Sequence, residues 1–173
     1  MNVNSRGYIA KEALGSGVVN GLINGAFAWY LSRDKEQLLV WGEKGMVVDF
    51  LFTALILVFL LSLIVLPLQR RKFAKASTVV QPPFAFIRYL GWAAGYRDSV
   101  KSLLLALTAV VASLPLLWLV FSLMGAQSYS PYEFTVLKSV YTGLLSVAVV
   151  PVVILFARHP VRRIKEKKEG ELV

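Results

Sequence analysis

Four apolar segments, each about as long as a membrane-crossing helix, dominate this chain. They cover residues 13–31, 46–68, 102–124 and 136–157. Because the hydrocarbon core of a bilayer requires about 20 apolar residues of helix, each segment predicts one membrane span. Hydrophobic residues make up 57% of the chain and charged residues only 17%, which is too apolar a balance for a soluble domain of 173 residues. The sequence therefore predicts one all-α, polytopic membrane domain, in which four transmembrane helices form two antiparallel hairpins.

The first segment is the least typical, because glycine and asparagine interrupt it. Arg6 and Lys11 precede it, and the Ala-Phe-Ala sequence at 26–28 resembles the cleavage site of a secretory signal peptide. A signal peptide has a continuous apolar core, however, and this segment lacks one. We therefore expect a retained helix.

Within this segment, glycines recur every four residues beside two asparagines, at Gly17, Gly21, Gly25, Asn20 and Asn24. A spacing of four returns to one helix face after about 1.1 turns, so the glycines form a groove, or glycine zipper, and the amides form a polar ridge beside it. One interpretation is a tight helix–helix seam, within the chain or between copies. The other is a polar lining near mid-membrane that contacts a ligand or an ion.

The positive charges indicate an orientation. With four spans, 15 of the 19 Lys and Arg residues lie on one side of the membrane, and three lie on the other, at Arg33, Lys35 and Lys44. Because positively charged loops stay in the cytoplasm, both termini, the basic connection 69–101 and the basic tail 158–173 are predicted to be cytoplasmic. The expected partner of these charges is the anionic inner leaflet of a cell (inner) membrane.

Part of the basic connection is itself apolar. Residues 82–97 begin with two prolines and carry aromatic side chains among arginines. A helix in this segment would place Tyr89, Trp92 and Tyr96 on one face, which suits an interfacial helix between the second and third spans. The alternative is a well-packed loop.

Two ionisable residues lie near the outer ends of their spans. Asp49 precedes Arg70 by 21 residues and Lys138 precedes Arg158 by 20, which places the two at similar depth. A charge near the membrane is costly, and opposite charges at one level lower that cost by pairing. We therefore predict that Asp49 and Lys138 face each other. Snorkelling to the outer headgroups and participation in proton or ion movement are the alternatives.

The same comparison suggests that the chain is a duplicated hairpin. In each half, an ionisable residue is followed by a proline and then by arginine: Asp49, Pro67 and Arg70 in the first half, and Lys138, Pro151 and Arg158 in the second. The first helices of the two halves do not match. Duplication is therefore a hypothesis for the structure to test.

Catalytic patterns are missing from the sequence. The chain has no cysteine, and its one histidine, His159, lies among basic residues at the inner boundary. No HExxH helix, glycine-rich phosphate loop or carboxylate pair is present. The net charge of +9 is not accompanied by a motif that reads nucleic acid. We therefore expect no enzyme activity, no cofactor, no metal site and no nucleic-acid partner.

Several local motifs together resemble a known group of proteins. These are the Asn-Gly-rich first helix, Trp-Gly-Glu at 41–43, Leu-Pro-Leu-Gln-Arg-Arg at 66–71 and Leu-Lys-Ser-Val-Tyr at 137–141. The chain resembles the small, uncharacterised four-span bacterial inner-membrane proteins loosely called permease-like. The resemblance implies an inner-membrane location, and it carries over no activity or site residue.

Two functions fit these observations. The first is a non-enzymatic membrane protein that acts by helix–helix association, either with itself as a homo-oligomer or with another membrane protein in a larger complex. The second is a small transporter or channel-like component with a polar path lined by Asn20, Asn24, Asp49 and Lys138. A path requires these residues to converge on a hydrated cavity, whereas a seam requires them to be packed dry.

Overall fold

The computed structural model describes residues 5–76 and 97–158, and within them the chain is all-α, with four long helices. Their bounds are α1 Ser5–Ser32, α2 Met46–Ala76, α4 Asp98–Met124 and α5 Pro131–Arg158. Two short strands, β1 Leu38–Leu39 and β2 Ser128–Tyr129, lie in the connections. The prediction of an all-α chain with four long helices is confirmed for these residues. Apart from Arg97, the segment 82–97 and its expected interfacial helix lie outside the described residues, as does the tail beyond Arg158.

Three of these helices are long and apolar enough to cross a membrane. They are Met46–Phe73, Asp98–Met124 and Pro131–Ala157, which contain 18-residue windows with mean hydropathies of 2.9, 2.5 and 2.4. They contain the second, third and fourth predicted spans. The glycines and asparagines of α1 lower its hydropathy, and α1 is not among the three.

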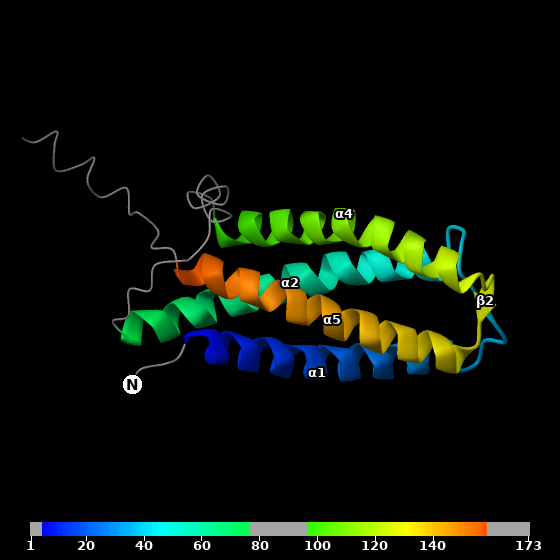
Figure 1. The fold of residues 1–173 in the computed structure, drawn as a ribbon, viewed down its shortest axis with the longest axis horizontal. Helices are drawn as coiled ribbons and strands as arrows, with labels where there is room; N and C mark the ends of the chain where they lie inside the picture. The colour runs from blue at the N-terminus through cyan, green and yellow to red at the C-terminus, as the bar shows by residue number, and fades with distance from the viewer. Residues whose placement is uncertain (1–4, 77–96, 159–173) are drawn as a thin grey trace, which may run out of the picture.

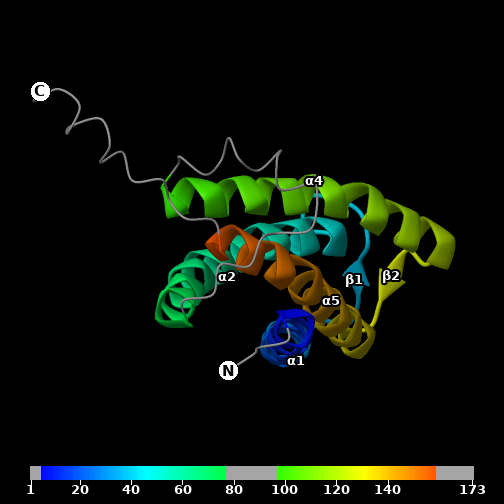
Figure 2. The same ribbon diagram turned by 60° about the vertical axis from the view of Figure 1, so that its left-hand side comes forward.

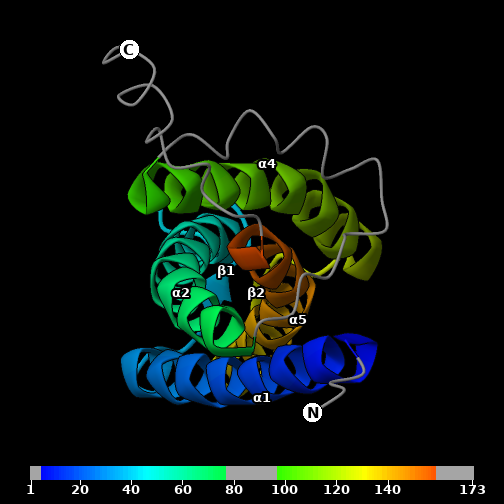
Figure 3. The same ribbon diagram turned by 90° about the vertical axis from the view of Figure 1, so that its left-hand side faces the viewer.

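The helices pack in an order that differs from the expected hairpins. α2 and α5 lie side by side in the centre, while α1 and α4 cover them from opposite sides (Figure 1 and Figure 3). The most extensive contacts join α1 to α5 and α4 to α2, rather than helices that follow each other in the chain. The reason is shape, because the glycines of α1 match a small-residue surface on α5.

One end of the bundle, here called the strand end, is closed by the two connections. β1 and β2 pair antiparallel, with Leu38 opposite Tyr129 and Leu39 opposite Ser128 (Figure 2). The opposite end, here called the basic end, contains the start of α1 and α4 and the end of α2 and α5 (Figure 1).

Local sequence explains how the helices begin and end at the strand end. Ser130 and Glu133 form a capping box: the Ser130 N–H donates to Glu133 Oε2 at 2.8 Å, and the Glu133 N–H donates to Ser130 Oγ at 3.3 Å. Pro131 occupies the first position of α5, where its missing N–H costs nothing. α4 ends at Gly125, whose φ of 67° is the left-handed conformation that glycine adopts most readily.

The two halves of the chain bury equivalent positions. Along α2 and α5 the buried side chains recur every four residues, at Phe50, Ala54, Val58, Ser62 and Leu66 and at Phe134, Lys138, Thr142, Ser146 and Val150. A constant shift of 84 residues relates the two columns, and it also relates Pro67 to Pro151. A shift of 89 relates buried residues of α1 to buried residues of α4, as in Ala28 and Leu117.

These shifts define a pseudo-two-fold repeat, α1–α2 followed by α4–α5, which supports the duplication hypothesis. Its register differs from the one expected. The buried columns align Asp49 with Glu133 and Ala54 with Lys138, so Asp49 and Lys138 are not equivalent residues. Phe50 and Phe134 are equivalent to each other in the two halves, and their rings stack with centroids 5.9 Å apart.

Candidate functional site

The three glycines of α1 face α5 of the same chain. A methyl group added at Gly17 would lie 2.5 Å from Val147 Cγ2 and 3.0 Å from the Gly143 carbonyl oxygen. One added at Gly21 would lie 3.0 Å from the Ser139 carbonyl oxygen, and one at Gly25 would overlap the Ser139 side chain. The glycine groove is therefore a tight seam within the chain.

Hydrogen bonds cross this seam. Ser139 Oγ donates to the Gly21 carbonyl at 3.0 Å, and Thr142 Oγ1 reaches the Asn20 carbonyl at 3.5 Å. Such bonds are possible because glycine lets the two backbones approach closely. They hold α1 at one rotation about its axis, which decides where its two asparagines point.

The asparagine side chains do not enter the seam. Asn20 Nδ2 donates to the carbonyl of Ser16 at 2.9 Å and to its hydroxyl at 3.1 Å, and Asn24 Nδ2 donates to the Asn20 carbonyl at 2.9 Å. Neither carboxamide oxygen receives a hydrogen bond from any residue that the structure describes. Both amides are only half-buried.

The asparagines face a groove of about 470 Å³ between α1 and α2, here called the α1/α2 groove. On the α1 side it is lined by Ser16, Asn20 and Asn24, and on the α2 side by a mainly apolar stripe that runs from Thr53 to Val65. The sequence predicted either a seam or a polar lining at this helix. The glycines form the seam and the amides line the groove, while contact of the amides with a ligand or an ion stays a prediction.

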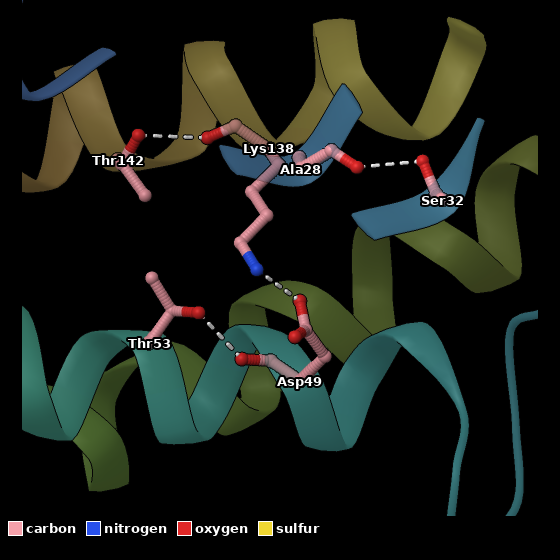
Figure 4. Close-up of polar contacts among 6 residues, drawn as sticks. All are labelled: Ala28, Ser32, Asp49, Thr53, Lys138 and Thr142. Carbon is pink, nitrogen blue, oxygen red and sulfur yellow. Dashed lines mark hydrogen bonds and ion pairs between the residues drawn. The ribbon is translucent and has the colours of Figure 1, made fainter. Parts of the chain in front are cut away.

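Asp49 and Lys138 form a salt bridge between the central helices (Figure 4). Lys138 Nζ lies 2.6 Å from Asp49 Oδ2 and 5.4 Å from the centre of the Phe134 ring. The Lys138 side chain is 10% exposed and that of Asp49 is 44% exposed. The pairing expected from the sequence is present, and it joins α2 to α5 near the strand end.

The four polar candidates thus fall into two places. Asn20 and Asn24 line the α1/α2 groove, whereas neither Asp49 nor Lys138 does. One turn further along α5, Thr142 is fully buried and donates to the Lys138 carbonyl at 2.8 Å. Lys138 and Thr142 are therefore both buried between the helices.

Contacts at the basic end were missed by the sequence reasoning, which assigned these cations to lipid headgroups. Arg70 Nη1 lies 2.6 Å from Asp98 Oδ2, and Lys72 Nζ lies 2.9 Å from Glu12 Oε1. These two salt bridges tie α2 to α4 and to α1. Glu12 in α1 and Asp98 in α4 are acidic residues at the basic end of the bundle, and they could have predicted these salt bridges from the sequence.

A second groove, of about 490 Å³, was also not predicted. It lies between α4 and α5 and is here called the α4/α5 groove. It is lined mainly by apolar residues, and inside it the Tyr141 hydroxyl hydrogen-bonds to Ser113 Oγ at 3.0 Å. Tyr141 ends the Leu-Lys-Ser-Val-Tyr motif, but the sequence assigned it no contact, because its partner is 28 residues away on another helix.

Within residues 5–76 and 97–158, no three His, Cys, Asp or Glu side chains are grouped as metal ligands. Comparisons with models of protein families, with curated proteins and with solved structures find no match for the chain.

Proposed function

We propose that the protein is a four-span membrane protein with α1 as its first span. α1 has the reverse of a soluble helix's pattern. Its buried residues are mostly small, at Ala13, Gly17, Gly21, Gly25 and Ala28, while its large apolar side chains Val18, Leu22 and Phe27 are each more than 60% exposed. An apolar outer face around a small-residue seam is suited to lipid, which solvates such side chains. The 28 residues of α1 are also long enough to span.

The proposed orientation has the basic end in the cytoplasm, at the inner membrane. Among the described residues, this end carries most of the basic residues, including Arg71, Lys72 and Arg97, whereas the strand end carries Arg33, Lys35 and Lys44 interspersed with acidic residues. The positive-inside rule supports this assignment.

The proposed activity is association inside the bilayer, without catalysis. The observation that carries it is the pair of half-buried carboxamides in the α1/α2 groove, whose oxygens receive no hydrogen bond from the residues that the structure describes. An amide oxygen in hydrocarbon is stabilised when a donor reaches it. The glycine seam is occupied by α5, so the surface available to a partner is this groove and the exposed face of α1. The partner is a second copy or another membrane component.

A polar path for transport is less well supported by the geometry. Asn20 and Asn24 lie in one groove, whereas Lys138 and its neighbour Thr142 are buried against the central helices. Transport would require these two groups to share one hydrated space.

The association proposal is tested by the mass of the protein in mild detergent or nanodiscs. We expect the wild type to elute with a second copy or a stoichiometric partner, and an Asn20→Leu/Asn24→Leu double variant to elute as a single chain. Ser113→Ala, which alters the α4/α5 groove instead, is the control and should associate as the wild type does. A wild type that is monomeric and free of stoichiometric partners would overturn the proposal.

A further inference from the structure

The two grooves occupy equivalent places in the pseudo-two-fold repeat. The shift of 89 residues makes Ala109 and Ser113 the equivalents of Asn20 and Asn24. Both Ala109 and Ser113 line the α4/α5 groove. The shift of 84 residues makes Tyr141 the equivalent of Leu57 in α2, and Tyr141 also lines the α4/α5 groove. The same site therefore occurs twice in this chain, with different side chains.

The difference between the grooves lies in where the hydrogen-bond donor comes from. In the α4/α5 groove, the Tyr141 hydroxyl donates a hydrogen bond to Ser113 Oγ at 3.0 Å. In the α1/α2 groove, the residue equivalent to Tyr141 is Leu57, which has no hydroxyl. The Asn24 oxygen, at the position of Ser113, receives no hydrogen bond from the described residues. The first groove thus lacks the phenolic hydroxyl that the second groove supplies from its own chain.

We propose that the α1/α2 groove binds an apolar, bilayer-soluble small molecule that carries a phenol-like hydroxyl, which donates to the carboxamide oxygen of Asn24. This inference rests on one part of the proposed function, that the amides of the groove serve an occupant from the bilayer, and it assigns the groove to a small molecule and leaves the exposed face of α1 to a protein partner. The molecule replaces the hydroxyl that Tyr141 provides in the equivalent groove.

The size and lining of the groove fit such a ligand. Its volume of about 470 Å³ is within the range of about 300–1,000 Å³ typical of small-molecule sites. Apolar residues such as Ile56, Leu60 and Ile64 form most of its wall, and the few polar groups lie together on α1. This is the usual composition of a site in which one polar contact orients an apolar ligand.

The depth and charge of the groove argue against a phospholipid headgroup. Asn24 lies eight residues before the end of α1 at Ser32, or about 12 Å along the helix at 1.5 Å per residue. Headgroups lie at the membrane surface, whereas Asn24 lies well inside. Among the described residues that line the groove, none is charged, so an anionic group would find no counter-ion.

The test uses 4-nonylphenol and its methyl ether, 4-nonylanisole, as matched probes. They differ in the hydroxyl donor, so the ether measures binding to the apolar wall alone. Each is titrated into the full-length protein in nanodiscs, and empty nanodiscs give the partitioning background. We expect wild-type protein to bind the phenol about tenfold more tightly than the ether, as one hydrogen bond allows.

Three variants assign the effect to this groove. Asn24→Leu should bind the phenol and the ether equally, because it removes the acceptor. Leu57→Tyr should lose the preference for the phenol, because it copies the arrangement of the α4/α5 groove and supplies the hydroxyl from within. Tyr132→Phe, which removes an exposed hydroxyl outside both grooves, is the control and should bind as the wild type does. Circular dichroism and a monodisperse elution profile confirm that each variant is folded.

Equal affinities of the wild type for phenol and ether would overturn the ligand proposal, and so would a phenol preference that persists in folded Asn24→Leu. Neither result affects the association proposal, which is tested separately by the mass of the complex. If the protein is an oligomer whose Leu57→Tyr variant dissociates while no probe binds, the groove is occupied by a protein side chain and the small-molecule proposal is wrong.

Discussion

Lys138 and Asp49 form a salt bridge of 2.6 Å between the two central helices, although they occupy non-equivalent positions in the two halves of the chain. The equivalents of this pair are Ala54 and Glu133. The ion pair therefore breaks the pseudo-two-fold symmetry at the point where the halves meet. It also gives Lys138, which is largely buried beside the Phe134 ring, its one close counter-ion among the described residues.

Replacing Asp49 with Asn should destabilise the protein by about 2 kcal/mol, because it leaves a buried ammonium without an opposite charge. The partial exposure of Asp49 keeps the expected loss below that of a fully buried pair. Thermal unfolding in detergent measures the effect. A double variant, Asp49→Leu/Lys138→Met, should recover most of the lost stability, since it removes both charges. Unchanged unfolding of Asp49→Asn would show that the pair contributes nothing.

Gly17→Ala and Gly15→Ala should shift stability in opposite directions. Both substitutions improve intrinsic helix propensity by up to about 1 kcal/mol. At Gly15 nothing lies within 4 Å of the new methyl group, so this gain should appear as a higher melting temperature. At Gly17 the methyl group would meet Val147 and the backbone of Gly143, so the seam must open and the melting temperature should fall. Equal shifts at the two positions would contradict the packing of α1 on α5.

The two halves of the chain should need each other to fold. α1 packs mainly on α5, and α4 packs mainly on α2, so each half places its first helix against the other half. When the chain is divided between residues 77 and 96, we expect neither fragment to accumulate alone in membranes. Co-expressed fragments should co-purify through a tag on one of them. Stable accumulation of either fragment alone would show that a hairpin is self-sufficient.

Stability should fall at acid pH through Glu12. Burial alone would raise the pKa of this carboxyl, but the neighbouring Lys72 and Tyr8 and the charge of Lys11 outweigh burial and hold the pKa below its ordinary value near 4.5. Because the folded-state pKa is the lower one, the stabilisation is present above about pH 4.5 and is lost as the pH falls through the folded-state pKa.

The matched variant for this effect is Glu12→Gln. At pH 6 its melting temperature should be below that of the wild type, and the difference should shrink as the pH is lowered to 3. A difference that stays constant over this range would mean that the Glu12–Lys72 salt bridge makes no pH-dependent contribution.

Single cysteines can establish the topology, because the chain has none of its own. We expect Asp34→Cys to react with a membrane-impermeant maleimide on intact bacterial cells that express the protein. Lys11→Cys and Arg71→Cys should react only after the membrane is permeabilised. If Lys11→Cys and Asp34→Cys were labelled from the same side, α1 would not span, and the four-span proposal would fail.

The apolar segments and the charged pair were predictable from the sequence because each depends on a short-range rule. A run of about 20 apolar residues predicts a helix that can span, whatever surrounds it. Opposite charges at similar depth predict a pair, because few other partners exist at that level. Both rules gave the right helices and the right partner for Lys138, although the register of the repeat inferred from the same residues was wrong.

The helix partners and the grooves could not be predicted in this way. Chain order favoured hairpins, but Gly17 and Gly21 fit the backbone of α5 more closely than any surface of α2, and that fit depends on two shapes at once. The sequence by itself therefore determined which segments are helical and apolar, since these properties belong to each segment alone. Only the tertiary structure decided that the glycines face α5, that Asn20 and Asn24 consequently turn toward α2, and that the groove they line has a counterpart holding Tyr141 and Ser113. The physical reason is that packing rotates α1 as a rigid body, so one contact places every side chain on the helix.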